Sequence, residues 1–74
     1  MTDTWNPWGM PEIDASMAQR IIKGARRHGA KPRIRRIDGH DFLSVYDPDI
    51  GACYGGNELI RRGDVDAVRK MLAA

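Results

Sequence analysis

The clearest pattern in the chain begins at Asp14, where apolar side chains start to recur every three or four residues. On a helix these side chains share one arc, and they are Met17, Ala18, Ile21, Ile22, Ala25 and His28. Four basic residues fill the opposite arc: Arg20, Lys23, Arg26 and Arg27. Asp14 or Ser16 can cap the first turn, and Gly29 can end the helix in a left-handed conformation. The pattern therefore predicts an amphipathic helix with a basic outer face.

Between residues 32 and 46 the pattern becomes that of a β-hairpin. Asp38-Gly39 is a strong signal for a two-residue type I′ turn, and it predicts strands over residues 32–37 and 40–46. The register that follows pairs Ile37 with His40, Arg36 with Asp41, and Ile34 with Leu43. One face then carries Ile34, Leu43 and Val45, and we expect it to face the core. The other face carries Arg33, Arg35, Phe42, Ser44 and Tyr46.

The C-terminal third predicts shorter elements. We expect a turn over residues 47–51, a short third strand over 52–54 and a break at Gly55-Gly56. A short helix is expected over residues 58–62, and Asp64 is expected to cap a last helix that ends near Leu72. Residues 57–72 resemble the inner helix, Gly-Asp turn and outer helix of one ankyrin repeat. Stacked repeats need at least about three copies, so the resemblance implies only a pair of helices here.

The first residues differ in composition from the rest. Residues 1–12 contain Pro7, Pro11 and both tryptophans, Trp5 and Trp8, and they read as an arm. The indole rings could cap a small core, or they could form an aromatic hook for a partner. Residues 13–74 then form one compact α+β domain, since 74 residues are too few for two cores.

Charge is strongly segregated along the chain, although its formal net value is only +2. Residues 20–36 contain no acid and eight basic residues: Arg20, Lys23, Arg26, Arg27, Lys31, Arg33, Arg35 and Arg36. The segments before and after this basic block each carry a formal charge of −3. Such segregation favours an acidic or polyanionic partner. The alternative is a solvated face that nearby aspartates partly neutralise.

The expected function is therefore binding. The candidate binding residues are Arg20, Lys23, Arg26, Arg27, Lys31, Arg33, Arg35, Phe42, Tyr46, Trp5 and Trp8. The first hypothesis is an inhibitor or adaptor that docks on a protein or nucleoprotein complex with an acidic surface. In size and charge distribution, but in no motif, the chain is similar to the anti-CRISPR inhibitors of phages. The second hypothesis is a nucleic-acid-binding module, in which the basic residues contact phosphates and Phe42 or Tyr46 stacks on bases.

Catalytic and metal-binding functions find little support. Cys53 with His28 or His40 could in principle form a nucleophile and a base, but a chain this short rarely encloses a pocket. Asp47, Asp49 and Glu58 match some positions of a calcium loop, but Ala52 stands where that loop needs glycine. We expect no enzyme activity, no metal and no cofactor. We expect no membrane segment either, a cytoplasmic location, and a monomer or homodimer.

Overall fold

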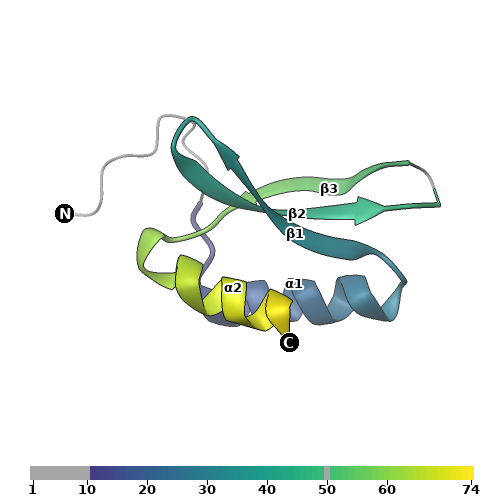
Figure 1. Ribbon diagram of the computed structural model, residues 1–74, viewed down its shortest axis with the longest axis horizontal. Coiled ribbons are helices and arrows are strands. Elements are labelled where there is room, and N and C mark those ends of the chain that lie inside the picture. Colours follow the sequence, from purple (N-terminus) through teal and green to yellow (C-terminus); the bar gives the residue numbers. More distant parts are fainter. Residues whose placement is uncertain (1–10, 50) are drawn as a thin grey trace.

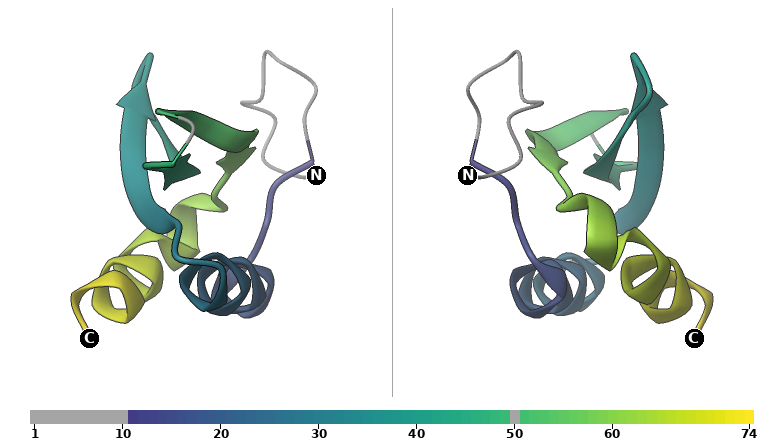
Figure 2. Two further views of the ribbon diagram at one scale, coloured as in Figure 1. Left: turned by 90° about the vertical axis from the view of Figure 1, so that its right-hand side faces the viewer. Right: turned by 90° about the vertical axis from the view of Figure 1, so that its left-hand side faces the viewer.

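The computed structural model describes residues 11–49 and 51–74, without the side chains of residues 52–56. The elements follow in the order α1 (Ala15–Arg27), β1 (Lys31–Ile37), β2 (His40–Asp47), β3 (Ala52–Leu59), a 3-10 turn η1 (Arg62–Asp64) and α2 (Val65–Ala73). The three strands form an antiparallel sheet in the order β1-β2-β3. Both helices lie on the same face of this sheet (Figures 1 and 2). The expected α+β class is confirmed.

Helix α1 begins and ends where the sequence predicts. The Asp14 carboxylate accepts a hydrogen bond from the Met17 N–H at 2.9 Å, so Asp14 is the N-cap. His28 is the C-cap, and Gly29 follows with φ of +80°, a conformation that glycine adopts without steric cost.

The hairpin is also confirmed, together with its register. Asp38 and Gly39 both have positive φ, at 51° and 78°, as a type I′ turn requires. Ile37 pairs with His40, and the register continues without a break to Lys31 opposite Tyr46. Because β2 also pairs with β3 on its other side, it lies at the centre of the sheet.

The region after β2 differs from the prediction. β3 extends to Leu59, and the pair Gly55-Gly56 lies within it. The short helix expected over residues 58–62 is wrong, because Glu58 pairs with Leu43 and Leu59 with Phe42. Long-range pairing with the central strand prevails here over a local helical pattern. One 3-10 turn precedes α2, so the ankyrin-like pair of helices is not formed.

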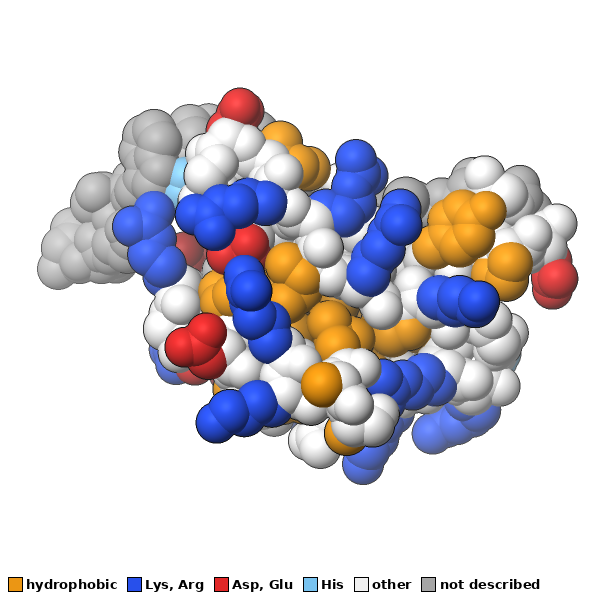
Figure 3. Space-filling model, in the orientation of Figure 1, with side chains coloured by type: hydrophobic (Ala, Val, Ile, Leu, Met, Phe, Trp, Pro, Cys, Tyr) orange, Lys and Arg blue, Asp and Glu red, His pale blue; other side chains and the backbone are white. Residues whose placement is uncertain are grey.

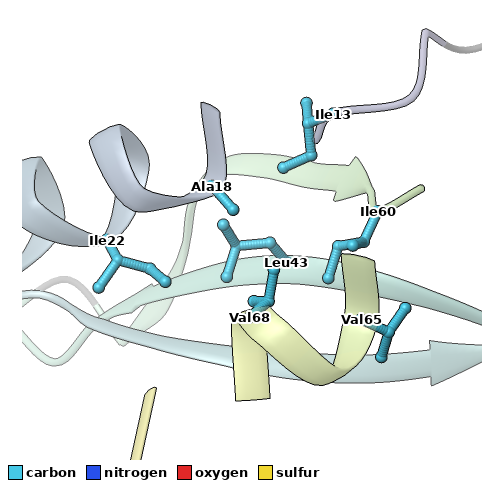
Figure 4. Close-up of a cluster of buried hydrophobic side chains, with 7 residues drawn as sticks. All are labelled: Ile13, Ala18, Ile22, Leu43, Ile60, Val65 and Val68. Carbon is cyan, nitrogen blue, oxygen red and sulfur yellow. The ribbon is translucent and has the colours of Figure 1, made fainter. Parts of the chain in front are cut away.

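The core lies between the helices and the sheet. Its main cluster contains side chains from α1, β2 and α2 and from the residues just before α1 and just after β3 (Figure 4): Ile13, Ala18, Ile22, Leu43, Ile60, Val65 and Val68. A smaller cluster contains Ala25, Ala30 and Val45. Ile21 and Ile34, both expected to face the core, are half-buried at its margin, as is Leu72 of α2. The prediction for Met17 is wrong, because 43% of this residue is exposed.

The start of α1 is fastened to the end of β3. Ile13 forms a parallel bridge with Ile60, in which its N–H donates to Leu59 and its carbonyl accepts from Arg61, both at 2.8 Å. The Asp64 carboxylate accepts from the Ala15 N–H at 2.9 Å. Asp64 was expected to cap α2, but its side chain makes no such hydrogen bond and contributes to the N-terminus of α1.

Candidate docking surface

Two members of the basic block, Arg26 and Arg36, form hydrogen bonds or ion pairs within the domain. Arg36 lies 4.0 Å from the Asp41 carboxylate across the hairpin, and Arg69 of α2 approaches the same group at 3.8 Å. Arg26 donates to the carbonyls of Met71 and Leu72, at 3.5 and 3.2 Å, near the end of α2. An arginine at that position adds a donor to the last carbonyls of a helix, of which the Met71 carbonyl also accepts from the Ala74 N–H at 3.4 Å. Arg26 and Arg36 thus connect secondary-structure elements.

The other six basic residues of the block are exposed: Arg20, Lys23, Arg27, Lys31, Arg33 and Arg35. Within residues 11–49 and 51–74, the ion pairs that form use Arg36, Arg61 and Arg69 instead. The described acids therefore leave the charge of these six residues uncompensated by direct contact.

These six residues form two groups that face away from each other. Lys23 and Arg27 lie on α1 opposite its buried stripe and so point away from the sheet, and Arg20 lies at the border of this outer face. On β1, Ile34 contacts the core cluster, so its neighbours Arg33 and Arg35 point to the opposite face of the sheet. The basic block therefore does not form one continuous surface, because the two-layer core separates the helix group from the strand group.

The strand group consists of Lys31, Arg33 and Arg35, three cations at alternate positions of β1. The guanidinium carbon of Arg33 lies 5.7 Å from the centroid of the Tyr46 ring. A cation–π contact of this kind contributes about 0.5–1 kcal/mol at an exposed site. It holds Arg33 against the sheet and orders one cation of the group.

Phe42 does not belong to the surface. It is only 3% exposed, and its neighbour on the same face of β2, Ser44, is fully buried. An antiparallel sheet commonly leaves one face to solvent, so the hairpin pattern alone does not reveal this burial. Phe42 is therefore not exposed for stacking in this structure, and Tyr46 is the one aromatic side chain beside the strand group in the described residues. Trp5 and Trp8 lie outside the described residues.

The side of the molecule formed by β1 and α2 is predominantly basic. Figure 3 looks onto this side, and Lys and Arg side chains lie above and below a central strip of apolar side chains. In Figure 2 β1 stands at the outer margin of the sheet, directly above the helical layer. An exposed apolar strip between cations suits a partner that is acidic without being uniformly charged.

A second feature lies between α1, β2 and β3. A hollow of about 530 Å³ has apolar walls that include Ile21, Ala25, Leu43 and Val45. Arg20, His28, Asp47 and Glu58 supply charged or polar groups of both kinds. Sequence analysis missed Glu58 here because it placed this residue on a helix. The mixed charge gives this hollow no preference for an acidic partner, in contrast to the β1 side.

The remaining candidate sites gain no support. Among the described residues, no group of three or more His, Cys, Asp or Glu side chains is placed to bind a metal. The Asp47 carboxylate accepts from the Asp49 N–H at 2.9 Å, which confirms an acidic turn at this point. The described helices include none of the length and apolarity that crossing a bilayer requires. No family model, curated protein or solved structure matches the chain.

Proposed function

We propose that the protein is a non-enzymatic inhibitor or adaptor that docks on an acidic surface of a protein or nucleoprotein partner. The observation that supports this proposal is the strand group: Lys31, Arg33 and Arg35 are exposed on an edge strand, and no described acid pairs with them. Complementary charge on a partner would accelerate the encounter and fix the orientation of docking. The helix group supplies additional long-range attraction.

The alternative is a nucleic-acid-binding module that uses the same cations. Its best support is the pairing of Arg33 with Tyr46, since arginine and an aromatic ring are common contacts for unpaired bases. Two observations rank it second. Phe42 is buried, and Arg33 already covers the Tyr46 ring. A platform on which several bases could stack is therefore lacking among the described residues.

The two functions can be separated with a charge-reversal variant, Arg33→Glu/Arg35→Glu, and a matched control, Arg62→Glu/Lys70→Glu. The control changes the net charge equally at two exposed cations outside the basic block. The immobilised proteins are incubated with cell lysate before and after nuclease treatment. We expect wild type and control to retain the same proteins after nuclease treatment, and the Arg33→Glu/Arg35→Glu variant to lose them. Equal retention by all three proteins would refute the proposed surface.

Labelled single- and double-stranded oligonucleotides test the alternative directly. For a nucleic-acid ligand, the logarithm of the affinity falls linearly with the logarithm of the salt concentration. Binding of about micromolar strength at low salt, lost in Arg33→Glu/Arg35→Glu and kept in the control, would favour this alternative. We expect only weak binding without sequence preference, which disappears near physiological salt.

A further inference from the structure

The outer edge of β1 is itself a binding element. We infer that β1 accepts an acidic, extended segment of the partner as a fourth strand of the sheet. This inference rests on the proposed function and specifies how docking occurs. In strand addition, main-chain hydrogen bonds supply affinity, and alternate side chains supply specificity.

The hairpin determines which main-chain groups of β1 are free. Ile37 and His40 flank a two-residue turn, so they form a hydrogen-bonded pair. Hydrogen-bonded and non-hydrogen-bonded pairs alternate along an antiparallel ladder. The main-chain groups of Arg35 and Arg33 therefore point toward β2, whereas those of Arg36 and Ile34 point outward.

A contact on the other side of β2 supports this assignment. The Asp41 carbonyl accepts a hydrogen bond from the Ile60 N–H at 3.0 Å, so it points away from β1. Arg36, the partner of Asp41, must then be in a non-hydrogen-bonded pair. Pro32 is also at an outward position, where the missing N–H of proline removes no bond within the sheet.

The outward groups are open in the described part of the chain. The hydrogen bonds found for residues 11–49 and 51–74 include none to the N–H of Ile34 or Arg36, or to the carbonyls of these residues and Pro32. The opposite side of the sheet differs, because Ile13 pairs with Leu59 and Arg61 there. One edge of the sheet is thus paired where the other offers free donors and acceptors.

The side chains of β1 determine the chemistry of the added strand. Lys31, Arg33 and Arg35 share one face, so an added strand with acids at alternate positions would place a carboxylate near each cation. On the other face Ile34 is half-buried at the core margin, so an apolar residue fits beside it. A second copy of β1 is excluded as the occupant, because it would set cations against cations.

The test uses the isotope-labelled full chain and a synthetic peptide of sequence Glu-Val-Glu-Val-Glu-Val-Glu. Binding is followed by NMR through the hydrogen exchange of single amides. We expect the exchange of the Ile34 and Arg36 amides to slow by about tenfold or more when the peptide is bound. The amides of Arg33, Arg35 and Ile37, already bonded to β2, serve as internal controls and should change little.

Two matched probes separate strand addition from simple charge attraction. The first is the same peptide with N-methyl groups on its valines, which keeps every charge but cannot complete a ladder. We expect the methylated peptide to bind at least about tenfold more weakly than the unmethylated one. The second is Lys-Val-Lys-Val-Lys-Val-Lys, which should bind Arg33→Glu/Arg35→Glu and not the wild type.

The outcomes divide clearly. Equal binding of the methylated peptide, or unchanged exchange at Ile34 and Arg36, would overturn strand addition and leave charge-dependent docking intact. The absence of any binding by the acidic peptide would also overturn strand addition. The proposed function would then be tested separately, by the lysate experiment described above.

Discussion

The two edges of the sheet are protected from unwanted pairing in different ways. The β3 edge is closed near its end by Ile13, which forms main-chain hydrogen bonds and is itself buried. The β1 edge is left open, but it carries Lys31, Arg33, Arg35 and Pro32, all of which discourage self-association. An edge that pairs with another segment of the same chain contributes to stability. An edge that is unpaired but charged could still bind a strand of complementary charge.

Under the proposed function, this difference separates stability from recognition in a small domain. Ile13 and Ile60 join the β3 edge to the main core cluster. The cations of β1 are exposed, and only Arg36 has an acidic partner among the described residues. Substitutions at the two edges should therefore affect different properties. Those near β3 should change the free energy of unfolding, and those on β1 should change the affinity for a partner.

The largest effect is expected at the closed edge. Ile13→Ala removes a side chain that is only 9% exposed and contacts the main core cluster. The free energy of unfolding, measured by urea titration, should fall by about 2–5 kcal/mol, as for other buried isoleucines. Ile13→Val, the control, should cost about 0.5–1.5 kcal/mol. A loss of less than about 1 kcal/mol in the alanine variant would mean that the Ile13 side chain does not hold this edge.

A smaller effect is expected at the turn that positions the open edge. β1 has β2 as its single neighbour in the sheet, and Gly39 joins the two strands with φ of +78°. Gly39→Ala should destabilise the domain by about 1–2 kcal/mol, because a side chain is strained in this conformation. Gly63 is a matched control, since its φ is not positive and no atom lies within 4 Å of an added Cβ. Gly63→Ala should be neutral or slightly stabilising, and equal losses in both variants would contradict the role of the turn.

The contact between Asp64 and α1 should contribute less. Asp64→Ala removes the hydrogen bond to the Ala15 N–H and the contact with Arg61 at 3.3 Å. By analogy with other capping residues, the free energy of unfolding should fall by about 1 kcal/mol. Asp49→Ala, at an exposed turn, should change stability by less than about 0.5 kcal/mol. If both variants behaved alike in urea titration, the Asp64 contact would be energetically silent.

The smallest effect on stability is expected at the open edge. Arg35 is exposed and forms no ion pair among the described residues. Arg35→Ala should therefore change the free energy of unfolding by less than about 0.5 kcal/mol. The same variant should bind the acidic peptide measurably less well, as judged by NMR titration. A loss of stability above about 1 kcal/mol would show that Arg35 is structural and remove the contrast between the edges.

Local signals explain what could be predicted from the sequence. Asp38-Gly39 defines both strands of the hairpin and their register, because a two-residue turn leaves one pairing. Asp14 and Gly29 define α1 through capping chemistry that acts within a few residues. The exposure of Lys31, Arg33 and Arg35 follows from the same alternation.

The errors arise where distant segments meet. Leu59 belongs to a strand because it pairs with Phe42, a partner that no local pattern identifies. Phe42 is buried although it lies on the face of the sheet opposite both helices, and the local hairpin pattern does not indicate this. Ile13 is an isolated apolar residue and Ile60 lies in a segment whose local pattern predicts a helix, so their pairing in the core could not be inferred.

The contact between Asp64 and Ala15 also has a kinetic consequence. It joins residues separated by 49 positions, and closing a flexible loop of that length costs about 3 kcal/mol of entropy beyond a constant term. The hairpin closes through a turn of two residues, so it can form first, within microseconds. We expect Gly39→Ala to slow folding and Asp64→Ala mainly to accelerate unfolding, which stopped-flow measurements over a range of urea concentrations would distinguish. The open β1 edge, proposed above to bind the partner, would then form before the contacts that slow unfolding.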